Sequence, residues 1–177
     1  MKKIFGFLAV LVTIAAVAIA VPLTPGISVT ALIKHSHGGF QGVTTTITIA
    51  SSSSWKPIKN ATDNLWVQTE GVGFSWSSDN LVVAAIGDYT GLVTIALSGT
   101  NGDDVFIRCF NVTDNVQSGY IIGATMKGST SYHPVTIPLY LEVHTDNTKF
   151  RFEVENTTAG RDVVIRSAIY QVQYLHD

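Results

Sequence analysis

The stretch Leu92-Val93-Thr94-Ile95-Ala96-Leu97-Ser98 alternates large apolar side chains with smaller or polar ones. A period of two predicts a β-strand with one face against a core. Gly99 to Asp104 follows and contains an Asn-Gly pair, which is a strong signal for a tight turn between strands. Val105 to Asn111 is rich in apolar residues again. We therefore expect a β-hairpin over residues 92–111.

The same pattern extends outward in both directions. Thr44 to Ala50 is β-branched and alternating, Lys149 to Glu155 alternates charged and apolar residues, and Val163 to Leu175 predicts one or two long strands. Pro138 interrupts the run Val135–Val143, so that strand is expected at a sheet edge or a bulge. No segment after Leu23 has a helical period. Many short strands with turn signals between them predict an all-β protein, a jelly-roll β-sandwich.

An apolar N-terminal segment precedes this β-rich part. Lys2-Lys3 stand before Ile4–Ala20, a run without any charge, which we expect to form an apolar helix. Ala18-Ile19-Ala20 is an acceptable cleavage site, so the run could be a secretory signal cleaved after Ala20. The alternative is an uncleaved membrane anchor with the two lysines inside. An intact mass that lacks Met1–Ala20 would contradict the anchor.

Three regions follow from these patterns. Residues 1–25 are the signal peptide or membrane anchor helix, 26–70 a connector with one or more strands, and 71–177 the jelly-roll β-sandwich. The connector contains His35-Ser36-His37-Gly38-Gly39. Two histidines at this spacing can bind a metal in an extended chain, but without further ligands the motif is weak, and we expect a polar linker. The sequence therefore predicts no metal and no cofactor.

From Phe74 to the C-terminus the order of motifs resembles the tumour necrosis factor-like and complement globular-head jelly rolls, and the head-fibre and tail-fibre knobs of bacterial viruses. Gly87-Asp88-Tyr89 opens the strand that ends at Ser98, like the Gly-x-Tyr of those families. Ile169 to Leu175 ends the chain as their last strand does. One position departs from the pattern: Leu141 to Asp146 lacks the Gly-Asp that often precedes the penultimate strand.

The resemblance implies a homotrimer, since such domains usually form compact trimers. Aromatic residues on the expected strands could line the trimer interface. They are Tyr89, Tyr120, Tyr140, Tyr170 and Tyr174. The alternative is that these side chains belong to the core or to the ordinary surface.

No catalytic set stands out, so we expect no enzyme. The motifs of zinc proteases, serine hydrolases and phosphate-binding loops are absent from the sequence. Cys109, the one cysteine, is expected in a strand core; an intermolecular bridge or a nucleophile is the alternative. Glu153 and Glu155 share a strand face, and we expect that face to be solvated. Asn60, Asn111 and Asn156 begin N-glycosylation sequons, which matter only in a eukaryotic secretory route.

The charge balance excludes one class of partner. The formal net charge is −2, and the basic residues are scattered, so no field exists to hold nucleic acid. The leading hypothesis is a virion surface structural protein, a spike or fibre knob for host attachment or capsid-vertex assembly. A secreted adhesion or ligand-type jelly roll is one alternative. Another is a filament subunit that donates a strand from Val29–Ala50 to its neighbour. Expected partners are further virion or filament subunits, a host receptor or glycan, and a membrane through the N-terminal segment.

Overall fold

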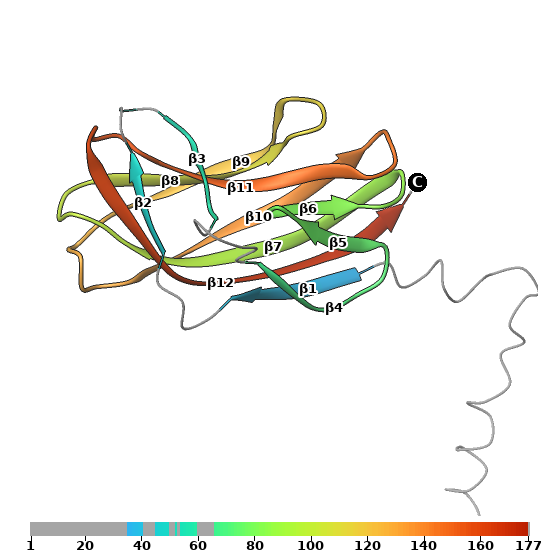
Figure 1. Ribbon diagram of the computed structural model, residues 1–177, viewed down its shortest axis with the longest axis horizontal. Coiled ribbons are helices and arrows are strands. Elements are labelled where there is room, and N and C mark those ends of the chain that lie inside the picture. The colour runs from blue at the N-terminus through green and yellow to red at the C-terminus, as the bar shows by residue number, and fades with distance from the viewer. Residues whose placement is uncertain (1–34, 41–44, 50–51, 53, 60–65, 177) are drawn as a thin grey trace, which may run out of the picture. The chain divides into compact units, whose positions relative to one another are not determined.

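The computed structural model describes residues 35–40, 45–49, 52, 54–59 and 66–176. These residues form twelve β-strands arranged in two antiparallel sheets, which stack as a sandwich (Figure 1). The part of the chain so described contains no helix with the length and apolar content that a membrane crossing needs. The all-β prediction is confirmed. The expected N-terminal helix over residues 1–25 lies outside the described residues.

The first sheet, sheet A, contains the longest strands of the described chain. Its order is β10-β7-β12-β1-β4, and β2 also pairs with β12. The bounds are β1 His35–Phe40, β2 Thr45–Ile49, β4 Val67–Gly71, β7 Gly87–Ser98, β10 His133–Val143 and β12 Arg161–His176. β12, the last strand, lies between β7 on one side and β1 and β2 on the other, so both ends of the described chain meet inside one sheet.

The second sheet, sheet B, has the order β5-β6-β11-β8-β9, and β3 also pairs with β11. The bounds are β3 Lys56–Pro57, β5 Phe74–Ser77, β6 Asn80–Val83, β8 Asp104–Asn111, β9 Val116–Thr125 and β11 Thr148–Asn156. Ser78 and Asp79 have φ of 50° and 60°, as a two-residue turn between β5 and β6 requires. This turn agrees with the one expected over Ser77–Asn80.

The core lies between the two sheets and is filled by the inward residue of each alternating pair. At its centre Trp66 stacks on Trp76 with ring centroids 4.9 Å apart, and Phe152 and Tyr170 pack around them. The polar atoms of this cluster are satisfied: Trp76 Nε1 donates to Tyr170 Oη at 2.8 Å, and Trp66 Nε1 donates to the Ile58 carbonyl at 2.9 Å. Buried aromatic side chains from both sheets thus hold the layers together.

The expected hairpin over residues 92–111 is wrong. β7 pairs with β10 and β12 in sheet A, whereas β8 pairs with β9 and β11 in sheet B. The turn itself is present, with φ of +87° at Gly102 and the Asp103 amide donating to the Thr100 carbonyl. Turn chemistry reverses the chain, but it does not decide whether the next strand stays in the same sheet. Here the chain crosses to the opposite layer.

Two other expectations concern the strand that contains Pro138 and the residue at which the sandwich begins. Pro138 lies on β10, the edge strand of sheet A, so the edge position expected from proline is confirmed. The boundary placed at residue 71 moves: β1, β2 and β4 pair within sheet A, and the compact unit that holds both sheets begins at Leu32. Residues 35–39 are a strand, not a linker. The sequence did not predict this strand, because Gly, Ser and His do not give the alternation of β-branched residues that is typical of strands.

Candidate interaction surface

The outer face of sheet A, on the side away from sheet B, carries mostly uncharged side chains over its middle. Burial alternates strictly along β10 and nearly so along β7 and β12, so every second side chain points outward. Over the middle of these three strands the outward residues are Thr90, Leu92, Thr94 and Ala96 on β7; Pro134, Thr136, Pro138 and Tyr140 on β10; and Ile169, Gln171, Gln173 and Leu175 on β12, whereas Asp88, Glu142 and Arg166 take outward positions nearer the strand ends. We call the set over the middle the neutral face.

The twelve residues of the neutral face include no Asp, Glu, Lys, Arg or His. A solvated sheet face normally carries charged residues at such positions. Instead, Leu92 is 51% exposed, Ile169 55% and Tyr140 41%. The register places Leu92 between Pro138 and Gln171 on the neighbouring strands, and Thr94 between Thr136 and Ile169. Apolar and uncharged polar side chains therefore form one continuous face across three strands.

Charged groups mark one end of the neutral face. Tyr140 Oη donates to Asp88 Oδ2 at 3.1 Å, and His176 Nε2 lies 3.7 Å from the same oxygen. The hydrogen bond to the Asp88 carboxylate raises the pKa of Tyr140, because deprotonation would place two negative charges side by side. Glu142 pairs with Asp88 across β10 and β7. Asp88 and Glu142 therefore mark the boundary of the neutral face at this end of β7 and β10.

A shallow open groove of about 610 Å³ lies where β1 and β12 meet. Its floor includes Gly38 and Gly39, and Gly39 stands opposite Ile169 in the register. Leu92, Thr94 and Gln171 of the neutral face contribute to the same groove. A Cβ atom at Gly38 or Gly39 would meet the backbone of β4 or β12 within 2.1 Å, so the two glycines allow these strands to lie close to β1.

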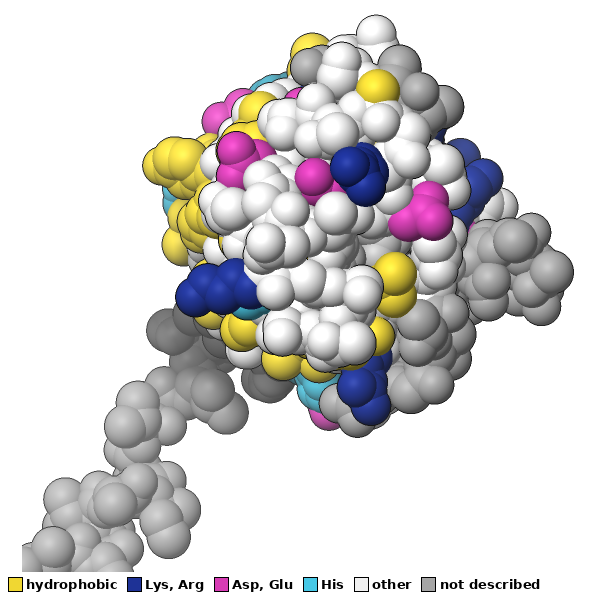
Figure 2. All heavy atoms as spheres, turned by 90° about the vertical axis from the view of Figure 1, so that its left-hand side faces the viewer, with side chains coloured by type: hydrophobic (Ala, Val, Ile, Leu, Met, Phe, Trp, Pro, Cys, Tyr) yellow, Lys and Arg dark blue, Asp and Glu magenta, His cyan; other side chains and the backbone are white. Residues whose placement is uncertain are grey.

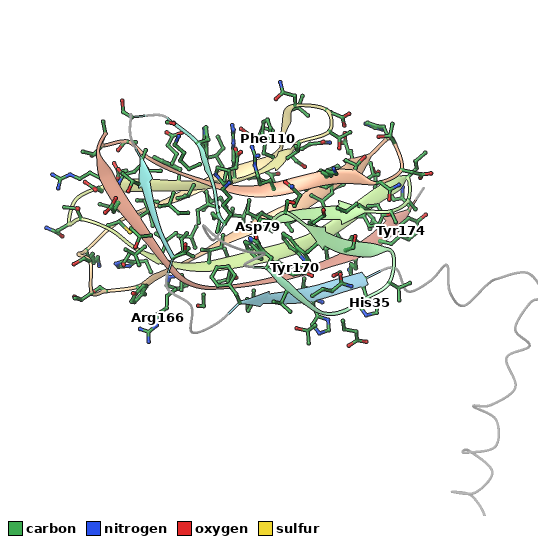
Figure 3. All side chains as sticks on the ribbon, viewed as in Figure 1. His35, Asp79, Phe110, Arg166, Tyr170 and Tyr174 are labelled. Carbon is green, nitrogen blue, oxygen red and sulfur yellow. The ribbon has the colours of Figure 1, made fainter. Side chains whose placement is uncertain are left out.

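The five predicted interface tyrosines are not brought together. Tyr89 and Tyr170 are buried at 1% and 3% exposure, because each takes an inward position of its strand. Figure 3 shows Tyr170 between the two sheets. Tyr174 packs its ring against Tyr89 at the end of the core. Packing therefore corrects the prediction for Tyr89 and Tyr170, which present no surface. Tyr120 and Tyr140 are exposed, and their place in an interface stays a prediction.

Leu92, Pro138 and Ile169 were missed by the sequence argument, which followed aromatic residues. The signal that could have found them is the lack of charge at the polar positions of alternating strands. Charges elsewhere are dispersed: Figure 2 shows one end of the molecule, with isolated acidic and basic side chains among uncharged ones. No basic patch is visible on that face.

Cys109 lies fully buried on β8. Burial, and secondarily the nearby Glu153 carboxylate, raise the pKa of its thiol far above the ordinary value. The thiol is therefore held protonated, which opposes a nucleophilic role and an intermolecular bridge. The expectation of a core cysteine is confirmed.

The two glutamates of β11 differ from the expected solvated pair. Glu153 is only 2% exposed, because Arg108 and Arg151 both bind its carboxylate. Arg108 Nε donates to Glu153 Oε2 at 2.8 Å, and the ring of Trp55 covers the Arg108 guanidinium at 4.3 Å. This carboxylate is neutralised and covered, so it offers no free acid or base.

Two of the sequon asparagines are structural. Asn111 Nδ2 donates to Asp114 Oδ2 at 2.8 Å, and Asn156 Nδ2 donates to Asp103 Oδ2 at 3.0 Å. Both asparagines are buried in the folded chain. Asn60 lies outside the described residues. The folded state therefore gives Asn111 and Asn156 a role at turns, with the amide nitrogen already engaged.

Comparison with solved structures places this architecture among known folds. The Eiger tumour necrosis factor of Spodoptera frugiperda matches with a TM-score of 0.52 and 13% identity, over 82% of this chain and 94% of that one. The globular domain of the zebrafish complement 1qA protein matches with 0.51 and 8%, over 81% and 98%. The PRD1 vertex protein P5 matches more weakly, with 0.49 and 11%, over 82% and 98%. No protein-family model matches the sequence, and no curated protein matches it significantly.

The similarity extends over most of this chain and nearly all of the compared chains, and it concerns the fold. The two-sheet sandwich is a jelly roll of the tumour necrosis factor and complement globular-head type, as the motifs between Phe74 and the C-terminus predicted. At identities this low, the shared fold does not carry a shared function with it.

Proposed function

We propose that this chain is a homotrimeric knob that assembles through the neutral face of sheet A and binds a partner, without catalysing a reaction. The observation that carries the proposal is the continuous uncharged outer face of β7, β10 and β12, with Leu92 and Ile169 each more than half exposed. The jelly-roll fold supports the trimer, because the resemblance to tumour necrosis factor-like and complement heads implies that habit.

The physical reason is the cost of removing a surface from water. Burying a charged side chain without a partner is very expensive, whereas burying Thr or Gln costs less and is offset when the partner surface supplies hydrogen bonds. The central part of a protein interface is depleted of charge and enriched in aromatic residues. The neutral face meets this description, with Tyr140 on its edge strand and the acidic group at Asp88 placed at its rim.

Where the knob is located depends on whether the N-terminal segment is cleaved. An uncleaved apolar segment would attach the knob to a membrane or a particle, and we propose a virion surface protein for host attachment or vertex assembly. Cleavage after Ala20 would instead release an extracellular ligand-type protein. A receptor or a glycan is the expected partner in both settings.

Strand donation to a neighbour has less support. β1 pairs with β12 and β4, and β2 pairs with β12, all within one chain. These two strands come from the segment that the filament hypothesis assigns to a neighbouring subunit. Both edges of β1 and one edge of β2 are already paired in sheet A, so we keep the knob as the proposed function.

The native mass of the full-length chain tests the trimer. We expect about three times the chain mass of 19.0 kDa by sedimentation or light scattering. Leu92→Lys should reduce this to a monomer with an unchanged circular dichroism spectrum, because it places a charge in the centre of the neutral face. The matched control is Ile86→Lys: Ile86 is 53% exposed, like Leu92, but lies outside the three strands. A monomeric wild-type chain, or a Leu92→Lys variant that stays trimeric, would contradict the proposal.

A further inference from the structure

Three side chains that can bind metal meet on the outer side of β1 and β4. His35 and His37 are two residues apart on β1, so both point to the same face of sheet A. Glu70 of β4 pairs directly with His37 in the antiparallel register, which places its side chain on that face too. Figure 3 shows His35 on the side of β1 that faces away from the other sheet.

The distances bring one atom of each residue close together. His35 Nε2 lies 3.7 Å from Glu70 Oε1, and His37 Nε2 lies 3.9 Å from Glu70 Oε2. The two imidazole rings are nearly parallel, 15° apart, and the three candidate ligand atoms all lie within 4.8 Å of one another. Among the described residues this is the one group of three such side chains.

These separations are close to those of a zinc site. Zn²⁺ binds histidine nitrogen and carboxylate oxygen at about 2.0–2.2 Å, which puts tetrahedral ligand atoms about 3.4 Å apart. The nitrogen-to-oxygen distances here, 3.7 Å to one Glu70 oxygen and 3.9 Å to the other, are longer, and a single set of three ligand atoms lies within 4.8 Å. Small side-chain rotations can close the difference, because all three side chains are partly or largely exposed. Two imidazoles with one carboxylate also match the ligand preference of zinc and its neighbours in the first transition row.

The backbone beneath these side chains is held in place. Ser36, between the two histidines, points inward and is hydrogen-bonded to Tyr170 Oη at 2.9 Å in the core. The Val72 amide donates to the His35 carbonyl at 2.8 Å and so continues the ladder past the end of β4. The register of β1 and β4 shifts between His37 and Gly38, and bulges often occur beside functional sites. Three ligands on two paired strands therefore need little ordering before a metal can bind.

The three residues leave at least one coordination position for another group. His37 also lines the groove beside Ile169 and Gln171, so a fourth ligand can approach from that side. We infer that His35, His37 and Glu70 form a binding site for a first-row transition-metal ion, Zn²⁺ in the first instance. This site goes beyond the proposed knob function, and it is present in one chain whether or not three chains assemble.

Equilibrium dialysis of the untagged full-length chain against Zn²⁺ tests the site. We expect about one Zn²⁺ per chain for the wild type. His37→Gln and Glu70→Gln should each weaken binding by at least about tenfold, because each removes one ligand. His144→Gln is the matched control: His144 Nε2 lies 3.9 Å from Glu142, but this pair belongs to no group of three among the described residues. Its zinc uptake should equal that of the wild type.

Histidine ring signals in NMR spectra locate the ion without any substitution. Addition of Zn²⁺ should shift the signals of His35 and His37 and leave those of His133, His144 and His176 in place. The inference is overturned if the wild type takes up no stoichiometric Zn²⁺, if His144→Gln lowers uptake as much as His37→Gln, or if other histidines shift instead. The native mass of the same samples reports on the trimer separately, so failure of one proposal can be told from failure of the other.

Discussion

Glu153 illustrates how a single side chain departs from its strand pattern. It occupies an outward position on β11, where Lys149 is exposed, and yet it is almost completely buried. The register explains this, because Arg108 stands directly opposite on β8 and Arg151 lies two residues earlier on the same face. β3 pairs with β11 at Glu153, and the ring of Trp55, just before β3, lies over the Arg108 guanidinium. A partly buried network of three charges replaces a solvated face.

Removal of the central charge should therefore destabilise the fold. Glu153→Gln leaves Arg108 and Arg151 close together without their shared carboxylate. Loss of one partner in a fully buried pair costs about 3–5 kcal/mol. We expect a lower loss of about 2 kcal/mol in the free energy of unfolding, because both arginines are partly exposed. Urea unfolding, followed by tryptophan fluorescence, measures the difference.

The neighbouring acid is the control for this change. Glu155→Gln alters the same residue type on the same face of β11, two residues further along. It should change the free energy of unfolding by less than about 0.5 kcal/mol, as surface substitutions usually do. Equal losses for the two variants would mean that the ion pairs with Arg108 and Arg151 contribute nothing measurable.

At the scale of strands, the pairing of β7 with β12 restricts the size of the residue at position 91, which is a glycine. A Cβ atom at Gly91 would lie 2.1 Å from the Gln171 carbonyl oxygen and 2.9 Å from two Val172 atoms. Backbone atoms of the neighbouring strand cannot move aside as the end of a side chain can. The glycine therefore allows β7 and β12 to approach closely in the middle of sheet A.

Gly91→Ala should force these two strands apart. We expect a loss of about 2–3 kcal/mol in the free energy of unfolding, in the upper range for overpacked sites. Gly102→Ala serves as the comparison, because nothing lies within 4 Å of its Cβ position and only its φ of +87° opposes the change. That backbone strain should cost about 1 kcal/mol. Thermal or urea unfolding of both variants measures these losses of free energy. A loss for Gly91→Ala no larger than that for Gly102→Ala would contradict the steric role of Gly91.

For the whole molecule, the extent of the sandwich can be tested by truncation. Strands β1 and β2 pair with β12, and five side chains before residue 71 belong to the core: Phe40, Ile47, Ile49, Ile58 and Trp66. Each buried side chain of this kind contributes about 1.5–3 kcal/mol. Together they rival the total stability of a domain, about 5–15 kcal/mol. A fragment that lacks them should not fold on its own.

Two fragments distinguish a domain that begins at residue 32 from one that begins at residue 71. Residues 32–177 should unfold cooperatively in urea, since this range contains every strand of both sheets. Residues 71–177, the range expected from the sequence, should show no cooperative transition and no near-ultraviolet circular dichroism. A cooperative 71–177 fragment of similar stability would restore the later boundary.

The sequence by itself determined the all-β class, the edge position of Pro138 and the burial of Cys109, because strand alternation and proline geometry act locally. The order of its motifs also indicated the jelly roll. Tertiary structure alone decided which sheet each strand joins, as the crossing after Ser98 shows, because a turn signal contains no information about long-range pairing. It alone decided which tyrosines face the core. It also brought Glu70 to His35 and His37, since residues more than thirty positions apart meet only when β1 and β4 pair.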